Sequence, residues 1–320
     1  MQRRSLVAAA LGAPVWSLSR AAGWPSRPIA MVVGYAAGGP TDAIARAIAE
    51  PLGRRLGQSC VVENKPGASG AVSILQERAM APDTHQLLFS GSGSLIMAPL
   101  INSKIGYRAG DLTPVARVSS YPYFLVVSAA SPVKTAAELV QKAREREGAL
   151  SYASAGPGSG NHMATEWFQA ATHTRLVHVP YSGDAAAMPD VITGRIDFAF
   201  LSGAVVQQQA RAGKLRVLAA ATTHRERAEG YPTVEEAAGI RGFAMEPWTG
   251  IFGPPRMPAE NVQKVNTAVA EVLAQPQVSR QLAGLGQYAF AETPARFKAF
   301  IDEQNTQWTA IAREAKIPRE

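Results

Sequence analysis

Four short segments rich in glycine and hydroxyl groups each follow an apolar run of the sequence. They are 38–42 (GGPTD), 90–94 (SGSGS), 152–162 (YASAGPGSGNH) and 179–184 (VPYSGD). Glycine lets backbone N–H groups approach a ligand closely, and Ser, Thr or Asp can cap a following helix. None of the four contains lysine or arginine, so they suit a small anion held by amides and helix N-termini. One such segment alone reads as an ordinary strand-to-helix turn, but four together favour a binding site.

The first segment resembles a phosphate-binding loop without completing one. Gly34, Gly39 and Thr41 have the spacing of that motif, but Pro40 stands in place of the lysine that reaches the phosphates. No glycine pattern of the dinucleotide-binding kind follows a predicted strand in full. The sequence therefore argues against a nucleotide, and Pro40 instead stiffens the turn.

Signatures of catalysis and of metal binding are missing from the sequence. No Gly-x-Ser-x-Gly motif occurs, and the five histidines lack the spacing of metal ligands. His162 alone follows glycines at a predicted helix start, where it could reach an anion. We expect no enzyme activity, no cofactor and no metal. The alternative is an exported hydrolase that uses Ser159 or Ser94 with His162.

Apolar runs that alternate with helical patterns must position these segments. Short runs rich in Val, Ile, Leu and Phe predict buried strands at 29–33, 60–62, 87–89, 124–127, 176–179, 196–200 and 215–221. Apolar spacings of three and four residues predict helices over 44–56 and 262–272, the first with a kink or restart at Pro51. Thr293 and Pro294 predict the start of a long C-terminal helix.

This alternation predicts an α/β fold with parallel sheets covered on both faces. A chain of 320 residues favours two doubly wound lobes over one sheet. Ligands of such sheets bind outside the carboxyl ends of the strands, where loops lead into helix N-termini. The four glycine-rich segments occupy such places.

The N-terminus predicts an export signal. Arg3 and Arg4 precede an apolar stretch at 6–16, and small residues surround the expected cleavage site near Ala21 or Ala22. The stretch is well short of the roughly 20 residues of a membrane span. We therefore expect a periplasmic protein, with the general secretory and twin-arginine routes both open.

Composition and charge are those of a globular protein without a polyanionic partner. Of its residues 47% are apolar and 18% charged, and the net charge is +7. Removing the signal would take away Arg3, Arg4 and Arg20 and leave +4. The remaining basic residues are scattered, so we expect no nucleic-acid partner. Cys60 is the one cysteine, which excludes an internal disulfide, and its apolar surroundings predict an inert residue in a buried strand.

Ordered segments from Trp24 onward closely resemble the Bug or TctC family of periplasmic solute-binding proteins. They are "WPSRPIAMVVGYAAGGPTD", "LGQSCVVENKPGASG", "YASAGPGSGNH", "HVPYSG", "GRIDFAF", "GKLRVLA" and "PTVEEAAG". The resemblance implies a type II periplasmic-binding-protein fold, in which two lobes joined by a hinge close on the ligand. It also implies a small carboxylated ligand, no catalytic activity, and delivery to the membrane subunits of a tripartite tricarboxylate transporter. We expect the protein to be a monomer.

The resemblance also implies which residues hold the ligand. The expected ligand-binding set is Gly38, Gly39, Pro40, Thr41, Asp42, Ser92 and Ser94 in the first lobe, and Ser154, Ala155, Gly158, Ser159, His162, Tyr181 and Asp197 in the second. In the family, a stretch bearing threonine and histidine and ending in Asn-Pro follows the third strand. Here Leu95 replaces that histidine and Ala98 the asparagine, which hints at a ligand with a larger apolar or aromatic part. Alternatively, Leu95 and Met97 pack as a core-facing helical turn.

The expected lobes are 23–123 with 249–320, and 124–248, with chain crossings near 121–124 and 247–252. Closing them on a carboxylate would exclude water and strengthen its contacts with amides and hydroxyls. A periplasmic sensor that signals to a membrane kinase would use the same pocket, and the sequence leaves that alternative open.

Overall fold

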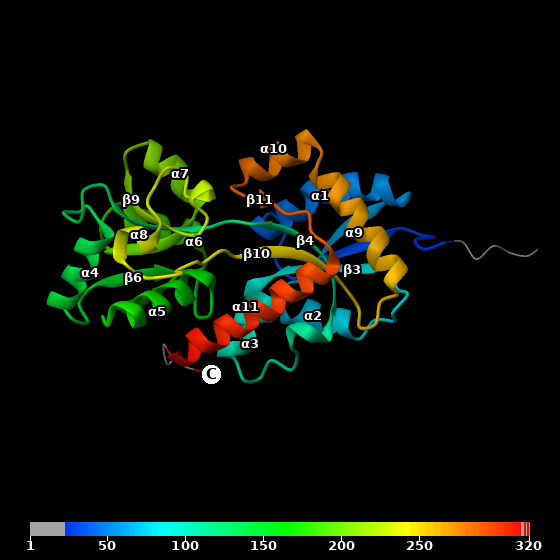
Figure 1. The fold of residues 1–320 in the computed structure, drawn as a ribbon, viewed down its shortest axis with the longest axis horizontal. Coiled ribbons are helices and arrows are strands. Elements are labelled where there is room, and N and C mark those ends of the chain that lie inside the picture. The colour runs from blue at the N-terminus through cyan, green and yellow to red at the C-terminus, as the bar shows by residue number, and fades with distance from the viewer. Residues whose placement is uncertain (1–22, 315–316, 318, 320) are drawn as a thin grey trace, which may run out of the picture.

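Two β-sheets, each flanked by helices, form the two lobes of the molecule (Figure 1). The computed structural model describes residues 23–314, 317 and 319, so the expected export signal lies outside the described residues. The two-lobed α/β arrangement predicted from the sequence is confirmed. Between residues 23 and 314, no helix is both long and apolar enough to cross a membrane.

The first lobe contains a six-stranded sheet in the order β11-β4-β10-β3-β1-β2. Its strands are β1 (Ile29–Val33), β2 (Cys60–Asn64), β3 (Gln86–Gly91), β4 (Thr113–Ser120), β10 (Trp248–Gly253) and β11 (Tyr288–Ala289). Strands β1, β2 and β3 are parallel, whereas β10 runs antiparallel to both β3 and β4. The helices of this lobe are α1 (Pro40–Leu56), α2 (Ala71–Arg78), a π-helical turn (Gly93–Met97) with α3 (Ala98–Ile101), α9 (Ala259–Leu273), α10 (Pro276–Gly284) and α11 (Pro294–Glu314).

The second lobe contains a five-stranded sheet in the order β7-β6-β8-β5-β9. Its strands are β5 (Tyr123–Ser128), β6 (Ser151–Ser154), β7 (Val177–Pro180), β8 (Phe198–Ser202) and β9 (Leu215–Ala221). Strand β6 is parallel to β7 and β8, and β5 is antiparallel to β8 and β9. Its helices are α4 (Ala136–Glu145), α5 (Gly160–Thr172), α6 (Asp184–Ile192), α7 (Gly203–Arg211) and α8 (Val234–Ala238).

Two extended segments connect the sheets. The chain leaves the first sheet after β4 and enters the second at β5, and it returns between β9 and β10. Strands β5 and β10 begin one residue before the expected lobe limits of 123/124 and 248/249, and these limits stay a prediction. The prediction of parallel sheets holds for β1, β2 and β3 and for β6, β7 and β8, but it is wrong for the remaining strands. Strands next to a crossing run antiparallel, because a chain that passes straight between sheets lacks the helical crossover that parallel neighbours need.

Helix α11 ties the two lobes together below the crossings (Figure 1). Its Trp308 lies edge-on to Trp167 of α5, with ring centroids 5.8 Å apart, and Trp167 stacks on Phe243 at 4.3 Å. One continuous core cluster runs from Leu88 of the first sheet to Phe200 of the second. Separate clusters fill the outer face of each sheet. As predicted, Thr293 caps α11 by accepting the Arg296 N–H at 3.2 Å.

Helix α1 continues through Pro51, so a restart at this residue is excluded and the kink stays a prediction. Packing against α9 and β2 holds the helix across the missing hydrogen bond. Its N-cap is Gly39, which makes no side-chain cap, so neither Thr41 nor Asp42 takes the N-cap position, although Asp42 Oδ2 accepts the Gly38 N–H at 2.9 Å. Cys60 is only partly buried, since β2 is an edge strand, yet burial still raises the pKa of its thiol to about 12.

Candidate ligand-binding site

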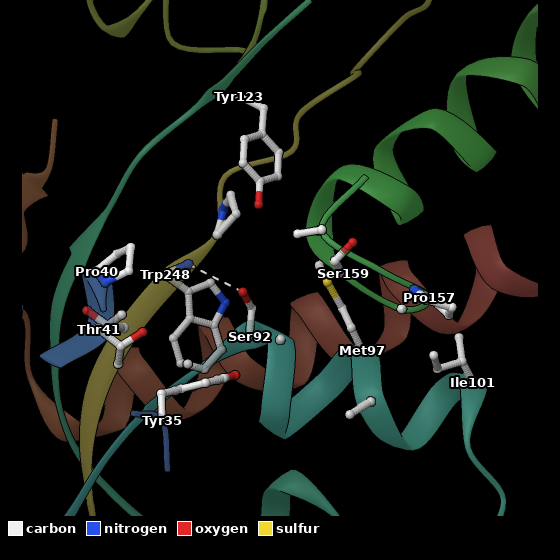
Figure 2. A pocket seen from close by; sticks show the side chains of 18 of the residues that line it. Tyr35, Pro40, Thr41, Ser92, Met97, Ile101, Tyr123, Pro157, Ser159 and Trp248 are labelled. Atoms are coloured by element: carbon white, nitrogen blue, oxygen red, sulfur yellow. Dashed lines mark hydrogen bonds between the residues drawn. The ribbon is translucent and has the colours of Figure 1, made fainter. Parts of the chain in front are cut away.

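A cavity of about 550 Å³ lies between the lobes. Loops after β1, β3 and β6 line it, together with the two crossing segments around Tyr121–Tyr123 and Pro247–Thr249. Figure 2 shows side chains from both lobes turned toward this space. Its volume falls within the range of about 300–1,000 Å³ that is usual for small-molecule sites.

The cavity wall carries no charged side chain among the residues that the structure describes. The N-terminal ends of α1 and α5 open onto it, through Pro40 and Thr41 on one side and Ser159 and Gly160 on the other. The first amides of a helix have no partner inside the helix and carry a partial positive charge. The wall can therefore hold an anion without a cationic side chain. Within the described chain, no cluster of three or more His, Cys, Asp or Glu residues could hold a metal ion.

In the first lobe, Asp42 fixes the loop rather than facing the cavity. Its carboxylate accepts hydrogen bonds of 2.9 Å from the Gly38 N–H, from Arg46 Nε and from Asn64 Nδ2. These bonds, that from Arg46 foremost, lower the pKa of Asp42 to about 2. Gly38 can turn back over the helix because its φ is +81°. Thr41 and Pro40 are thereby held at the cavity wall.

In the second lobe, the loop after β6 uses its amides internally. The N–H groups of Ala155, Gly156 and Gly158 donate to side chains, namely Asn161 Oδ1, Ser154 Oγ and His162 Nδ1, at 3.0 Å each. The Ser159 N–H donates to the Gly156 carbonyl at 3.1 Å. These four amides are thus engaged within the loop, whereas Gly160, the first residue of α5, still lines the cavity.

Behind this loop lies a stacked cluster of ionisable side chains. The rings of His162 and His178 stack 4.3 Å apart, and the Tyr152 ring lies 5.0 Å from that of His178 and 6.5 Å from that of His162. Tyr152 donates to Glu166 at 2.6 Å, and Ser154 Oγ lies 2.6 Å from His178 Nε2. Burial lowers the pKa of both histidines, that of His178 to about 4 with a further contribution from His162. Both histidines of the cluster are therefore neutral near pH 7, and the cluster supports the loop from behind.

Phenol groups supply neutral donors to the cavity. Tyr35, Tyr121 and Tyr123 all line it, and burial raises the pKa of each above its usual value. The Tyr35 hydroxyl lies 2.6 Å from Ser94 Oγ, and the rings of Tyr121 and Tyr123 meet edge to face at 5.7 Å. These side chains can donate to an anion at any physiological pH.

Trp248 stands at the centre of the first-lobe wall. Its side chain is 1% exposed, and its backbone N–H donates to Ser92 Oγ at 3.4 Å (Figure 2). Its indole Nε1 is buried and has no hydrogen-bond partner. Sequence reasoning missed Trp248, Tyr121 and Tyr123, although it expected the crossings at which they lie. Both crossings border the cleft, so the aromatic residues within them could have been predicted to line the cavity.

Six of the residues expected from the sequence line the cavity, and eight do not. The six are Pro40, Thr41, Ser92, Ala155, Gly158 and Ser159. Gly38, Gly39 and Asp42 form the loop behind Pro40, Ser94 lies behind Tyr35, and Ser154 and His162 lie behind the second-lobe loop. Tyr181 instead donates to Asp190 at 2.7 Å. Asp197 accepts the N–H of Ser151, the first residue of β6, at 2.9 Å; Asp197 itself directly precedes β8, so this bond lies at the strand ends opposite the loops.

The replaced residues after β3 divide between core and cavity. Leu95 and Met97 are both almost fully buried, but Leu95 packs in the shared core, whereas Met97 also lines the cavity. The core interpretation therefore holds for Leu95, whereas Met97 both packs in the core and lines the cavity. A ligand with a larger apolar or aromatic part stays a prediction. Ala98 and Ile101 extend the apolar wall beyond Met97.

The expected hydrolase pairs are not assembled. The Ser159 hydroxyl donates to the Gly156 carbonyl at 2.6 Å, and His162 Nδ1 accepts from the Gly158 N–H. Ser94 Oγ instead meets Tyr35. The Ser154 to His178 contact resembles a nucleophile and base, but Ser154 is fully buried and does not line the cavity.

Known proteins of the same architecture bind carboxylates. The Rhodopseudomonas palustris protein Rpa4515, solved with adipate, superposes with a TM-score of 0.81 at 29% identity, over 93% of this chain and 100% of its own. MatC (Rpa3494) from Rhodopseudomonas palustris, solved with bound malate, superposes with a TM-score of 0.77 at 29% identity, over 90% and 99% of the two chains.

Sequence comparison gives the same relationship. Protein BugT of Bordetella pertussis is 30% identical over 295 residues, which are 91% of this chain and 90% of BugT. The family model described as "Tripartite tricarboxylate transporter family receptor" matches residues 44–317. The resemblance read from the sequence motifs is thus confirmed, and the chain belongs to the TctC family of periplasmic solute-binding proteins.

Proposed function

We propose that this protein captures a small carboxylated compound between its lobes and delivers it to the membrane subunits of a tripartite transporter. The observation that carries the proposal is the cavity between the lobes, which has no charged side chain and onto which two helix N-termini open. Such a wall favours an anion over a cation. The adipate and malate found in Rpa4515 and MatC support the ligand class.

Binding would work by closure of the lobes, with proposed limits of 23–123 with 249–320, and 124–248. Ile101 of the first lobe packs so closely on Gly158 of the second that a Cβ at Gly158 would overlap the Ile101 side chain. This contact forms only when the lobes meet around the cavity. Closure would exclude water from the carboxylate and present a continuous surface to a membrane partner.

We further propose that the protein is exported, with cleavage near Ala21 or Ala22, and acts in the periplasm as a monomer without catalytic activity. The family is one of periplasmic binding proteins, which supports this location. N-terminal sequencing of the protein from an envelope fraction should begin near residue 22 or 23. A sequence that begins at Met1 would contradict export.

Native mass spectrometry of freshly purified mature protein tests ligand capture. We expect a bound mass that matches an organic acid and leaves on unfolding. Transport is tested separately: membrane vesicles that hold the two transporter subunits should take up that acid only when the protein is added. Uptake that is equally fast without the protein would contradict delivery.

A further inference from the structure

The loop between β6 and α5 is held at one of its amides by a histidine. Gly158 lines the cavity and meets Ile101 of the first lobe, and its N–H donates to His162 Nδ1 at 3.0 Å. In turn, the His162 N–H donates to Ser159 Oγ at 3.4 Å. Pro157 and Ser159, the neighbours of Gly158, are both labelled on the cavity wall in Figure 2. The point at which the two lobes meet is therefore held by the imidazole behind it.

This arrangement resembles a capping box with histidine in the third helical position. In a capping box, the N-cap Ser accepts the N–H of the third helical residue, and the Glu or Gln side chain of that residue accepts an N–H at the helix start. Ser159 is the N-cap of α5, and His162 is the third residue of the helix. Its imidazole accepts from Gly158, one residue before the cap. A Glu side chain would place a negative charge behind a cavity suited to anions, whereas a neutral imidazole does not.

The geometry fixes the protonation state of His162. Nδ1 can accept the Gly158 N–H only while it carries no proton of its own. The single ring proton is therefore on Nε2, which lies 3.7 Å from Glu166 Oε1. A second proton would make both ring nitrogens donors and would leave the buried Gly158 N–H without an acceptor. Because an unpaired buried N–H is unfavourable, the loop would then shift at Gly158.

The other groups that face His162 do not remove this sensitivity. The ring of His178 on β7 stacks on it at 4.3 Å, the ring of Tyr152 on β6 lies 6.5 Å away, and Glu166 is on α5 itself. Glu166 attracts a proton to the imidazole, but its carboxylate already accepts from Tyr152 at 2.6 Å and from Gln169 at 2.5 Å. Burial opposes the charge and keeps the pKa of His162 below its usual value. His162 is thus neutral near pH 7 and takes up a proton only in acid.

We infer that His162 is a positioning residue whose uncharged imidazole holds Gly158 against Ile101, so that acid loosens the second-lobe wall and weakens ligand binding. This inference rests on the proposed function and adds a regulation by pH to it. The Ala155 N–H donates to Asn161 Oδ1, an acceptor that does not titrate, so the response is confined to the Gly158 end of the loop. Affinity should be constant where His162 is neutral and should fall as the pH falls through its pKa.

The variant His162→Asn tests the inference, because its Oδ1 can accept the Gly158 N–H but cannot be protonated. The mature protein, freed of bound ligand by unfolding and refolding, is titrated calorimetrically at pH 7.5 and pH 5 with hexanoate, benzoate, malate, adipate and citrate. The readout, for the acid that binds best, is the Kd of the natural protein divided by that of His162→Asn. Protonation of the acid itself affects both proteins alike and cancels in this ratio.

We expect a ratio near 1 at pH 7.5 that rises at least threefold at pH 5. A ratio that does not rise, or that falls because a charged imidazole attracts the anion, would overturn the inference and leave the proposed function intact. Failure of all five acids to bind at pH 7.5 would overturn both. Circular dichroism at the two pH values checks that each protein is folded.

Two further variants separate the acceptor from its surroundings. His162→Ala removes the acceptor and should weaken binding at least threefold at pH 7.5, whereas His162→Asn should restore it. His178→Gln removes the neighbouring titratable ring but keeps the bond to Gly158, so its Kd should change with pH as that of the natural protein does. A pH response that disappears in His178→Gln and survives in His162→Asn would assign it to His178 and overturn the inference.

A nitrogen NMR spectrum of the histidine-labelled protein tests the proton position directly. At pH 7.5, His162 should carry its ring proton on Nε2, and in His162→Asn that signal should be missing. A ring proton on Nδ1 at this pH would contradict the bond to Gly158 and overturn the inference.

Discussion

The two walls of the cleft are held in place in different ways. The second-lobe loop satisfies most of its own amides and rests on the stacked histidines behind it. The first-lobe loop is held by the carboxylate of Asp42, which accepts the Gly38 N–H and the Arg46 Nε–H. The N-termini of α1 and α5 nevertheless open onto the same cavity. The comparison teaches that a carboxylate with a cationic partner holds one wall and that neutral histidines hold the other.

The largest expected effect comes from the contact that joins the walls. Gly158→Ala adds a methyl group that overlaps Ile101 and places alanine at a φ of +72°. Overpacking of this kind is unfavourable by about 1–3 kcal/mol, which corresponds to roughly a 5- to 150-fold weaker Kd. Calorimetric titration of the carboxylate that binds the natural protein best measures this change in Kd.

A second glycine with a similar φ separates the effect of overlap with Ile101 from the effect of backbone strain. Gly213→Ala has a similar φ of +68° in the same lobe, but nothing lies within 4 Å of its Cβ. It should lose about 1 kcal/mol of unfolding free energy from strain and bind normally. Additional truncation by Ile101→Ala should restore part of the affinity lost in Gly158→Ala. Normal binding by Gly158→Ala alone would show that the walls do not close at this point.

The support of the second-lobe wall should make stability depend on pH. His178, which faces His162, Tyr152, Glu166 and Ser154, has a folded pKa of about 4, whereas an unfolded histidine titrates near 6.5. Between these values the unfolded state binds more protons, so the unfolding free energy should fall as pH falls through this window. From pH 7 to pH 5 we expect a loss of about 1–2 kcal/mol, allowing for partial solvent screening.

Urea unfolding at the two pH values measures this loss. His178→Gln should reduce the difference between them, and part of the slope should survive because burial also lowers the pKa of His162. His224→Gln alters an exposed histidine and should keep the full slope. A natural protein as stable at pH 5 as at pH 7 would contradict the buried neutral cluster.

The smallest effect concerns the first-lobe loop. Asp42→Asn weakens the bonds to Gly38 and Arg46, and should lower the unfolding free energy at pH 7 by about 1 kcal/mol, a modest figure because Arg46 is half exposed. Since the folded pKa of Asp42 is depressed to about 2, its stabilisation exists above the unfolded pKa of about 4 and is lost as pH falls toward 2. The variant and the natural protein should therefore converge in stability near pH 2.

The exposed pair Glu50 and Arg54 on the same helix provides the control. Glu50→Gln should change the unfolding free energy by at most a few tenths of a kcal/mol. If both variants behaved alike, Asp42 would not hold the loop.

Local pattern predicted the framework of the fold well. Each apolar run identified in the sequence coincides with a strand, and five are buried as predicted, because buried strands of parallel sheets are continuously apolar. The prediction of burial is wrong for β2 and β7, which are edge strands with Val61 and Val177 exposed. The positions of Pro40, Thr41 and Ser159 at the cavity also followed from local rules, since glycine turns and helix starts collect at the carboxyl ends of strands.

Tertiary context decided what local pattern could not. The side chains of the segment 152–162 accept its own amides through bonds that span two to six residues. Residue types alone did not indicate this, because the same Ser, Asn and His side chains could equally face a ligand. His178 looked like an ordinary strand residue until β7 was placed beside β6. Trp248 lines the cavity only because β10 returns to the first sheet between β3 and β4.

The central claim is that the protein captures a carboxylate. Its most direct test measures the unfolding free energy of the mature protein, freed of bound ligand by unfolding and refolding, at increasing carboxylate concentrations. A ligand that binds only the closed, folded protein should raise it by RT ln(1 + [L]/Kd), which is about 2.7 kcal/mol at a hundredfold excess over Kd. We predict this rise for at least one carboxylate, and a smaller rise in Gly158→Ala at the same concentration. An unfolding free energy that no carboxylate changes would contradict the account.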